Sequence, residues 1–202
     1  MPRGKFITLE GVDGAGKSTH IGWLAQYLRG RGLEVVVTRE PGGTPLGETL
    51  RNLVLSEPMH IDTETLLMFA ARKEHLDRVI WPALDEGKWV ISDRFTDATY
   101  AYQGGGRQMP LNRIEILENW VQIGFQPDLT LFFHLSVDTA ASRRGERAGQ
   151  DRFEQQDRAF FERVSNAYLE RAKRNPHRLR VVDASRTIAD IENELEIILS
   201  GY

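Results

Sequence analysis

Apolar runs of strand length alternate along the chain with longer stretches of helical periodicity. Five apolar runs predict buried strands, at 5–10, 34–40, 88–93, 128–135 and 179–184. Helical patterns occupy the intervals, at 17–31, 46–55, 63–86, 112–124, 137–144, 154–174 and 187–199. Because strands that alternate with helices form a parallel sheet covered on both faces, the pattern predicts a three-layer α/β/α domain. Pro82 is expected to kink the longest helix. No repeat or interdomain linker divides residues 1–202, so a single domain is expected.

A glycine-rich stretch, GVDGAGKST, lies between the first strand and the first helix. It fits the phosphate-loop pattern G-x-x-x-x-G-K-[ST], with the required strand before it and helix after it. In such a loop backbone N–H groups turn onto phosphate oxygens, the lysine reaches the β- and γ-phosphates, and the serine ligates Mg²⁺. The candidate ATP-binding residues are Gly11, Val12, Asp13, Gly14, Ala15, Gly16, Lys17, Ser18 and Thr19. The alternative is an ordinary glycine-rich turn, which the flanking elements disfavour.

Charged residues outside the classical loop pattern suggest a second ligand. Asp13 would face bound polyphosphate, which is unfavourable unless its carboxylate serves another partner, such as a hydroxyl of an acceptor; the alternative is a solvated turn residue. Arg39, Arg51, Arg72 and Arg94 stand in apolar surroundings where strands and helices end. Each alone is more often a surface charge. Together with a phosphate loop they suggest a second anion site, the arrangement of a nucleoside monophosphate kinase.

Composition excludes several other classes. The net charge of −3 argues against a dedicated nucleic-acid binder, and the absence of cysteine excludes disulfides and thiolate chemistry. No N-K-x-D guanine motif is present, which argues against a GTPase. No apolar run approaches the roughly 18 residues of a membrane span, and the first strand leaves no room for a signal peptide. We therefore expect a cytoplasmic protein without membrane or nucleic-acid partners.

Longer motifs carry a family resemblance. The segments TREPGGTPLGETLR, FAARKEHL, DRFTDATYAYQGGGR, PDLTLFFHL and DRFEQ resemble bacterial thymidylate kinases, and the likeness spans nearly the whole chain. The resemblance implies the P-loop kinase fold with a five-stranded parallel sheet. It also implies a homodimer that transfers the γ-phosphate of ATP to thymidine 5′-monophosphate (dTMP), with Mg²⁺, giving dTDP for dTTP synthesis.

The resemblance also implies roles for individual residues. Asp13 matches the loop carboxylate that contacts the acceptor's 3′-hydroxyl, and Arg51 and Arg94 match arginines that hold the acceptor's phosphate. Asp93 ends a strand next to the loop and is expected, with Ser18, near Mg²⁺. The expected catalytic residues are Lys17, Arg94, Arg147 and Asp13. The expected dTMP-binding residues are Asp13, Glu40, Arg51, Met68, Phe69, Arg72, Arg94, Thr99, Tyr102 and Gln103.

The base-binding part of this set leaves two questions open. Arg72 matches the arginine that contacts a thymine carbonyl, while Thr99 and Gln103 match polar groups at the other edge of the base. Tyr102 matches an aromatic residue that crowds the 2′ position, although a core tyrosine is the alternative. Many family members have Phe where this chain has Met68, and Phe69 follows it. Either Met68 contacts the base through sulfur or the helix rotates to bring in Phe69.

A basic segment is expected to supply the remaining cation. One branch of the family has an arginine in the phosphate loop where this chain has Gly14. The segment RRGERAGQDR, at about 143–152, resembles the lid of the other branch, with Arg147 as the best match to its catalytic arginine and Arg143 as an ATP contact. The alternative for this segment is a solvated basic loop.

Two other functions remain compatible with the sequence. The chain could be a kinase of the same fold for another small acceptor, or a non-catalytic regulator gated by nucleotide. A regulator would be expected to have lost some of Asp13, Arg51 and Arg94, all of which are present. ADP formation that depends on dTMP separates the three functions.

Overall fold

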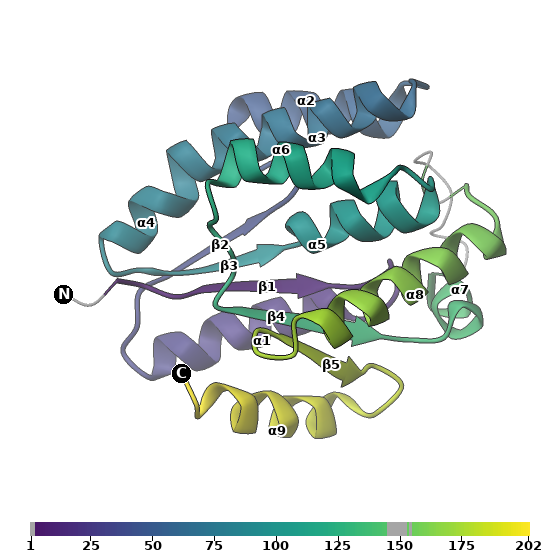
Figure 1. The fold of residues 1–202 in the computed structure, drawn as a ribbon. Coiled ribbons are helices and arrows are strands. Elements are labelled where there is room, and N and C mark those ends of the chain that lie inside the picture. The colour runs from purple at the N-terminus through teal and green to yellow at the C-terminus, as the bar shows by residue number, and fades with distance from the viewer. Residues whose placement is uncertain (1–2, 145–152, 154) are drawn as a thin grey trace.

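The computed structural model describes residues 3–144, 153 and 155–202. A five-stranded parallel sheet forms its centre, in the order β2-β3-β1-β4-β5 (Figure 1). The strands are β1 (Phe6–Glu10), β2 (Val35–Arg39), β3 (Trp89–Asp93), β4 (Leu129–His134) and β5 (Leu179–Asp183). The predicted α/β fold is confirmed, and each strand lies within two residues of its predicted bounds.

Helices fill every connection between the strands. The α-helices are α1 (Lys17–Gly30), α2 (Pro45–Ser56), α3 (Ile61–His75), α4 (Trp81–Asp85), α5 (Thr96–Thr99), α6 (Leu111–Gln122), α7 (Val137–Arg144), α8 (Arg158–Arg174) and α9 (Ile188–Leu199). Two π-helical segments, η1 (Leu76–Ile80) and η2 (Tyr100–Gly106), continue α3 and α5. No helix in the described ranges is long and apolar enough to cross a membrane.

Hydrophobic side chains cover both faces of the sheet. Successive side chains of a strand point to opposite faces. Leu9 of β1 therefore packs in one core with Leu24 of α1 and Leu195 of α9, whereas Phe6 packs in the other with Phe69 of α3 and Ile114 of α6. Figure 1 shows α1 and α9 on one side of the sheet and α3, α4 and α6 on the other. This is the expected three-layer arrangement.

The long helix predicted over 63–86 is irregular before its proline rather than at it. The α-helical hydrogen bonding of α3 gives way to η1, and α4 begins at Trp81, one residue before Pro82. Pro82 has no N–H to donate, so a regular ladder cannot pass through it. The wider turn of η1 accommodates this break one turn upstream of the predicted position.

The segment Thr96–Gly106 is helical although its apolar pattern did not predict a helix. Its three consecutive glycines lie in a closely packed region, and the last two face α8, where added side chains would not fit. A Cβ on Gly105 would lie 2.6 Å from Cβ of Ala167, and one on Gly106 would overlap the Phe160 ring. Glycines that weaken a helix in isolation therefore allow α8 to pack closely on η2.

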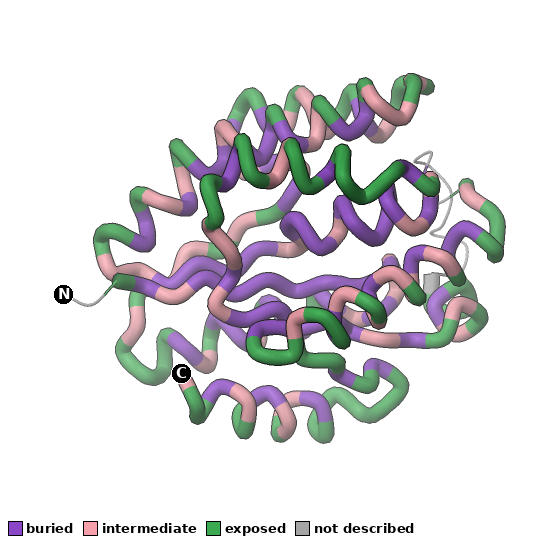
Figure 2. The backbone as a smooth tube through the Cα atoms, viewed as in Figure 1, coloured by how far each residue is buried: buried purple, intermediate pink, exposed green. Residues whose placement is uncertain are grey.

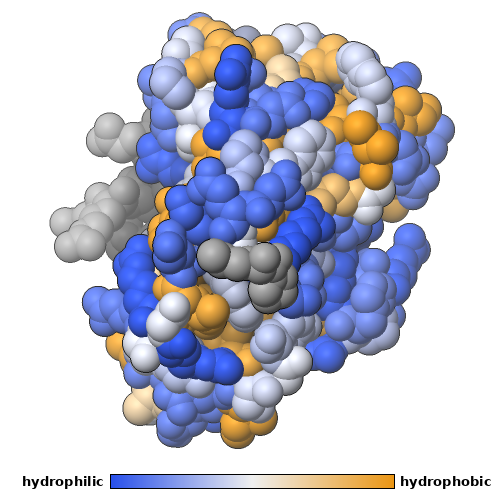
Figure 3. All heavy atoms as spheres, turned by 90° about the vertical axis from the view of Figure 1, so that its left-hand side faces the viewer, coloured by the Kyte–Doolittle hydropathy of each residue, from blue (hydrophilic) through white to orange (hydrophobic). Residues whose placement is uncertain are grey.

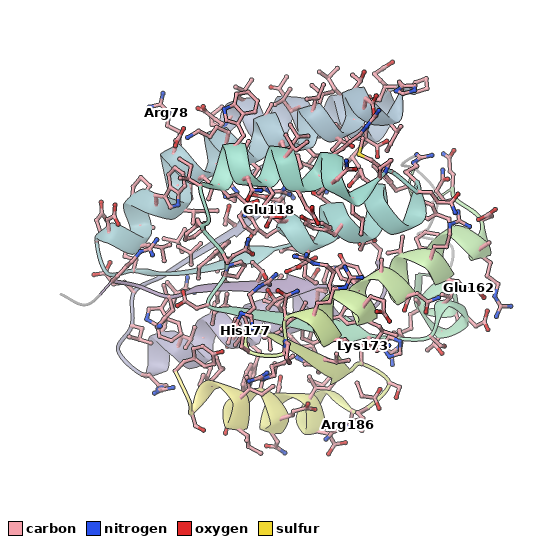
Figure 4. The ribbon with its side chains drawn as sticks, viewed as in Figure 1. Arg78, Glu118, Glu162, Lys173, His177 and Arg186 are labelled. Carbon is pink, nitrogen blue, oxygen red and sulfur yellow. The ribbon has the colours of Figure 1, made fainter. Side chains whose placement is uncertain are left out.

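Burial separates the inner elements from the surface (Figure 2). The inner strands β1, β3 and β4 and the segment η2 are largely buried, whereas the edge strands β2 and β5 are partly exposed and most of α6 is exposed. Charged surface side chains, among them Arg78 of η1, Glu162 of α8 and Arg186 in the turn before α9, point away from the sheet (Figure 4). Figure 3 views the end of the molecule where the strands begin, and hydrophilic residues there are interspersed with hydrophobic ones.

The glycine-rich loop and the candidate site residues lie at the other end of the sheet, where β1, β2 and β3 finish. In an open parallel sheet this is the edge at which ligands bind.

Candidate active site

The phosphate loop leaves the end of β1 through three glycines in the left-handed region. Gly11, Gly14 and Gly16 have φ angles of 140°, 88° and 89°. A Cβ on Gly11 would also lie 2.7 Å from the carbonyl oxygen of Phe133. Gly16 caps the N-terminus of α1 without a side-chain hydrogen bond, so the first N–H groups of the helix remain available to a ligand. This loop and helix terminus form an anion site.

Lys17 lies inside the loop and is almost fully buried. Its Nζ donates to the carbonyl oxygens of Gly11 at 3.0 Å and Val12 at 3.3 Å. The Asp13 carboxylate lies 3.6 Å from the same nitrogen. Burial, and next to it the positive charge of Arg94, lower the pKa of the ammonium group. An incoming phosphate would supply the negative charge that this buried lysine favours.

Arg94 connects the phosphate loop to the rest of the site. Its Nη2 donates to Oδ1 of Asp13 at 2.8 Å and to the hydroxyl of Tyr102 at 3.3 Å. Burial is the largest single effect and opposes its charge, but Asp13, Tyr102 and Asp93 together outweigh it, so the pKa of the guanidinium is raised well above its ordinary value. Its backbone has φ 69°, a left-handed conformation that a residue with a side chain rarely adopts.

Glu10, at the end of β1, stabilises the backbone turn at Arg94 through hydrogen bonds. Its Oε1 accepts the N–H of Phe95, the residue after Arg94, at 2.7 Å, and its Oε2 accepts the hydroxyl of Tyr168 at 2.8 Å. The side chain is fully buried, and this burial, with the nearby charge of Asp97, raises the pKa of Glu10 to about 8. Sequence reasoning gave Glu10 no role. An acid at the end of an otherwise apolar strand was the available signal.

Asp93 and Ser18 offer oxygen ligands for a metal beside the loop. Oδ1 of Asp93 is buried and has no hydrogen-bond partner within the described part of the chain, whereas Ser18 is exposed at the start of α1. No cluster of three carboxylate, histidine or cysteine side chains among the residues described would hold a metal alone. Mg²⁺ is commonly bound by one or two protein oxygens together with substrate phosphates. The residues present therefore fit Mg²⁺ bound with a nucleotide.

A cavity opens beside the loop, and all of the predicted acceptor-binding residues except Phe69 line it. The lining consists of Asp13, Glu40, Pro41, Arg51, Leu55, Met68, Arg72, Arg94, Phe95, Ala98, Thr99, Tyr102, Gln103 and Phe153. These residues come from the loop and from the segments that follow β2 and β3, with further walls from α2 and α3. Sequence segments far apart are thus combined into one site.

Two of the arginines predicted to form a second anion site, Arg51 and Arg39, differ in whether they line the cavity. Arg51 lines the cavity, and its Nη1 donates to the carbonyl oxygen of Pro41 at 3.0 Å. Burial and the charges of Arg39 and Arg94 lower the pKa of Arg51. Arg39 itself is half-exposed and pairs with Glu48 through two hydrogen bonds, of 3.2 and 2.8 Å. Arg39 therefore does not join the cavity, and the other three arginines do.

A buried hydrogen-bond network holds Arg72 against the cavity. Glu40 accepts Nε of Arg72 at 2.7 Å and pairs with Nδ1 of His75 at 3.0 Å. On the far side, Nε2 of His75 pairs with the hydroxyl of Thr38 at 2.7 Å. Burial raises the pKa of Glu40, but Arg72 and His75 outweigh this and lower it overall. Nη2 of Arg72 donates to Thr99 at 3.0 Å, and its buried Nη1 has no partner among the residues that the structure describes.

Met68 and Phe69 take different positions in α3. Met68 is partly exposed and lines the cavity. Phe69 is buried in the second core, with the guanidinium carbon of Arg72 4.7 Å from its ring centroid. The expectation that Phe69 contacts a ligand is not supported by this position, because Phe69 supports Arg72 from the core instead. The helix is not rotated to expose it.

Comparisons with known proteins bear on the same residues. A family model described as thymidylate kinase matches residues 9–195. The thymidylate kinase of Cupriavidus taiwanensis is 61% identical over 200 residues, which are 98% of each chain, and that of Nitrosomonas eutropha is 60% identical over 204 residues, which are 100% of this chain and 95% of that protein. The crystal structure of thymidylate kinase from Ehrlichia chaffeensis superposes with a TM-score of 0.81 at 35% identity, covering 98% of this chain and 99% of that one.

The chain belongs to the thymidylate kinase family. The family resemblance seen in the sequence motifs is thereby confirmed, as is the assignment to the phosphotransferase enzymes. The matched range of this thymidylate kinase family member contains the phosphate loop and every residue that lines the cavity.

The segment predicted to be a lid, at about 143–152, is described only at its start. Arg143 is in the last turn of α7, and its Nη1 donates to the carbonyl oxygen of Ala184, in the turn after β5, at 2.9 Å. Arg147 and Arg152 lie outside the described residues, so the lid assignment remains a prediction from the sequence.

Two further residues of the site were missed by sequence reasoning. His75 is fully buried behind Glu40, and Glu64 is almost fully buried behind Gln103, whose Nε2 donates to it at 2.7 Å. Neither lines the cavity. Both are polar residues on a helix face that packs against other elements, and this periodicity is the signal that could have identified them.

Proposed function

We propose that this chain transfers the γ-phosphoryl group of ATP to dTMP and releases ADP and dTDP. The observation that carries this proposal is the contact between Asp13 and Arg94, because it joins a phosphate loop to an arginine-lined cavity. Two phosphorylated ligands bound on either side of this contact would meet with their phosphates facing each other. Such a reaction needs positioning and positive charge more than covalent chemistry.

The donor half is assigned to the loop residues Gly11–Thr19. Backbone N–H groups and the N-terminus of α1 bind the ATP phosphates, and Lys17 neutralises charge at the β- and γ-phosphates. Ser18 and Asp93 would hold Mg²⁺, which would supply positive charge to the phosphate oxygens of the nucleotide. Asp13 accepts a hydrogen bond from the acceptor's 3′-hydroxyl while it orients Arg94.

The acceptor half is assigned to the cavity. Arg51 and Arg94 bind the phosphate of dTMP, whose oxygen attacks the γ-phosphorus as the bond to ADP breaks. Arg72, Thr99 and Gln103 contact the polar edge of the base, and Met68 lies against its face. Tyr102 is 7% exposed at the cavity wall and leaves little room for a 2′-hydroxyl.

The remaining cation is assigned to Arg147, with Arg143 as a further ATP contact. The position after Asp13 is Gly14, so the loop itself has no arginine there. The link from Arg143 to Ala184 brings the start of the lid segment next to the turn after β5. A guanidinium that closes over the phosphates would stabilise transferred charge.

A homodimer is also part of the proposal. Several large apolar side chains on α3 and around α6 are exposed, with Leu66 54%, Ile116 65% and Trp120 76% accessible. Apolar side chains gathered on neighbouring helices suit a contact with a second copy of the chain. The predicted cytoplasmic location rests on the sequence.

A coupled assay of ADP formation with a panel of nucleoside monophosphates tests the function. We expect rapid ADP formation with ATP, Mg²⁺ and dTMP, and far less with purine monophosphates. Turnover that prefers another monophosphate would identify a different kinase of the same fold. Nucleotide binding without ADP formation for any acceptor would identify a regulator.

A further inference from the structure

The amide of Gln103 is held in one orientation by Glu64. Gln103 is 1% exposed and Glu64 is also 1% exposed, and Nε2 of Gln103 donates to Oε1 of Glu64 at 2.7 Å. A carboxylate accepts hydrogen bonds and donates none, so the amide must turn its NH₂ group toward Glu64. Its carbonyl oxygen, Oε1, then has no hydrogen-bond donor among the described residues, and Gln103 lines the cavity.

The surroundings of Glu64 keep its carboxylate in place. Nη2 of Arg107 lies 3.8 Å from Oε2 of Glu64, and the Arg107 guanidinium lies 5.7 Å from the ring centroids of both Phe153 and Phe160. The backbone of Gln103 is also fixed, because its carbonyl oxygen accepts the N–H of Met109 at 3.0 Å. An acceptor-only group is thus maintained behind the amide.

Arg72 presents the opposite hydrogen-bonding character to the same cavity. A guanidinium donates and never accepts. Nε of Arg72 is engaged by Glu40 and Nη2 by Thr99, which leaves the buried Nη1 as a donor without a partner in the described structure. The cavity wall therefore offers one donor, from Arg72, and one acceptor, from Gln103.

We propose that Glu64 is a positioning residue that sets base specificity, an inference that rests on the proposed thymidylate kinase function. The donor and acceptor fixed by Glu40 and Glu64 match the imide edge of thymine and uracil, a 4-carbonyl beside an N3–H. Cytosine presents an exocyclic NH₂ donor beside an N3 acceptor, which is the reverse pattern. If cytosine bound here, its NH₂ group would face the Arg72 donor and its N3 would face the Gln103 carbonyl oxygen. Both pairs would leave buried polar groups without hydrogen bonds, which costs more binding free energy than a missing contact.

The test is the isosteric substitution Glu64→Gln, assayed for kcat/KM with dTMP, dUMP and dCMP. An amide at position 64 can donate or accept, so Gln103 is free to present either end to the base. We expect the ratio of dCMP to dTMP activity to rise about tenfold or more, while the ratio of dUMP to dTMP stays unchanged because both share the imide edge. An unchanged dCMP ratio would overturn the proposal.

Two matched variants separate amide orientation from general disruption. Arg107→Gln weakens the electrostatic support of Glu64 but keeps its carboxyl group, so the dCMP ratio is expected to rise less than in Glu64→Gln. An equal rise in that variant would contradict the proposal. The double variant Glu64→Gln with Gln103→Glu places a carboxylate at the cavity and a donor behind it. It is expected to restore discrimination against dCMP, and failure to do so would also count against the proposal.

The outcomes for the two proposals are distinct. If the wild-type chain forms no ADP with dTMP, the proposed function fails. If the wild-type chain is active and Glu64→Gln keeps its full discrimination against dCMP, only the role of Glu64 fails. Thermal unfolding of each variant identifies a loss of folding, and the double variant then still decides the question.

Discussion

The donor half and the acceptor half of the site are built in different ways. In the donor half the cations donate to groups of the phosphate loop itself: Lys17 donates to the carbonyl oxygens of Gly11 and Val12, and Arg94 donates to Asp13. In the acceptor half the charged groups are held from behind, since Glu40 and His75 fix Arg72 while its Nη1 has no partner in the described structure. The cations of the donor half must therefore exchange these partners for phosphate oxygens when ATP binds. In the acceptor half, Arg72 is already held in place before the base binds.

The difference follows from what each half recognises. A polyphosphate brings several negative charges, so cations that rest against loop oxygens gain better partners when it binds. A pyrimidine base is neutral, and its recognition depends on the direction of a few hydrogen bonds. Directional groups must be fixed before binding, and buried, paired charges such as Glu40 and Arg72 provide that rigidity at a cost in desolvation.

The substitution Arg94→Ala is expected to have the largest effect, because Arg94 belongs to both halves. It removes one partner of Asp13 and, in the proposed mechanism, a cation beside the transferred phosphoryl group. We expect kcat to fall about 10³-fold and KM for dTMP to rise as well, as measured by steady-state kinetics.

Arg94→Lys is the matched control for charge. It keeps the positive charge and loses the forked geometry, so we expect activity between that of Arg94→Ala and the wild type. Full activity of Arg94→Ala would show that the two halves do not meet at this residue.

A pair of glycine substitutions tests the rigidity of the acceptor half through stability. Gly43 has φ 78°, and a Cβ there would lie 2.5 Å from Nε2 of His75 and 2.6 Å from Oγ1 of Thr38. Gly43→Ala should therefore lower the free energy of unfolding by about 1–3 kcal/mol in urea titrations. Gly22 lies in α1, and a Cβ added there would meet nothing within 4 Å, so Gly22→Ala should raise it by about 1 kcal/mol. If the two substitutions changed the free energy of unfolding by the same amount, the residues around His75 would not be tightly packed.

The buried acid beneath the donor half predicts a smaller, pH-dependent effect. The folded-state pKa of Glu10 is about 8, above its ordinary value of 4.5, so the folded protein binds the proton more tightly than the unfolded chain does. The contribution of Glu10 to stability is complete below pH 4.5 and is lost as the pH rises through about 8. Glu10→Gln mimics the protonated form, so the stability of wild type relative to the variant should decline between about pH 5 and about pH 8. Parallel stability curves for the two proteins would contradict the raised pKa.

The fold and the donor loop could be predicted from sequence because their signals are local. Strand patterns and the spacing of Gly11, Gly16, Lys17 and Ser18 need no knowledge of distant residues. The segment Thr96–Gly106 was not predicted as helix, because its last two glycines are explained only by the close approach of α8. Local propensity there is overridden by tertiary packing.

The acceptor half could be predicted only in part, because some of its residues do not line the cavity and act by holding the residues that do. Motif resemblance identified the cavity-lining residues Arg51, Arg72 and Gln103. It did not identify Glu64 or His75. Glu64 contacts Gln103, which is 39 positions away in the chain, and His75 contacts Glu40, which is 35 positions away. Nor did it decide between Met68 and Phe69, because that choice depends on which face of α3 packs into the core.

Steady-state kinetics of Lys17→Met and Arg51→Ala, measured side by side with ATP and dTMP, test the division of the site most directly. Lys17→Met should lower kcat about 10²-fold or more with little change in KM for dTMP, since it removes charge stabilisation during transfer. Arg51→Ala should raise KM for dTMP about tenfold or more with a smaller change in kcat, since it removes a contact to a phosphate that is present throughout. If both variants change the same constant by the same factor, the separation into donor and acceptor halves is wrong.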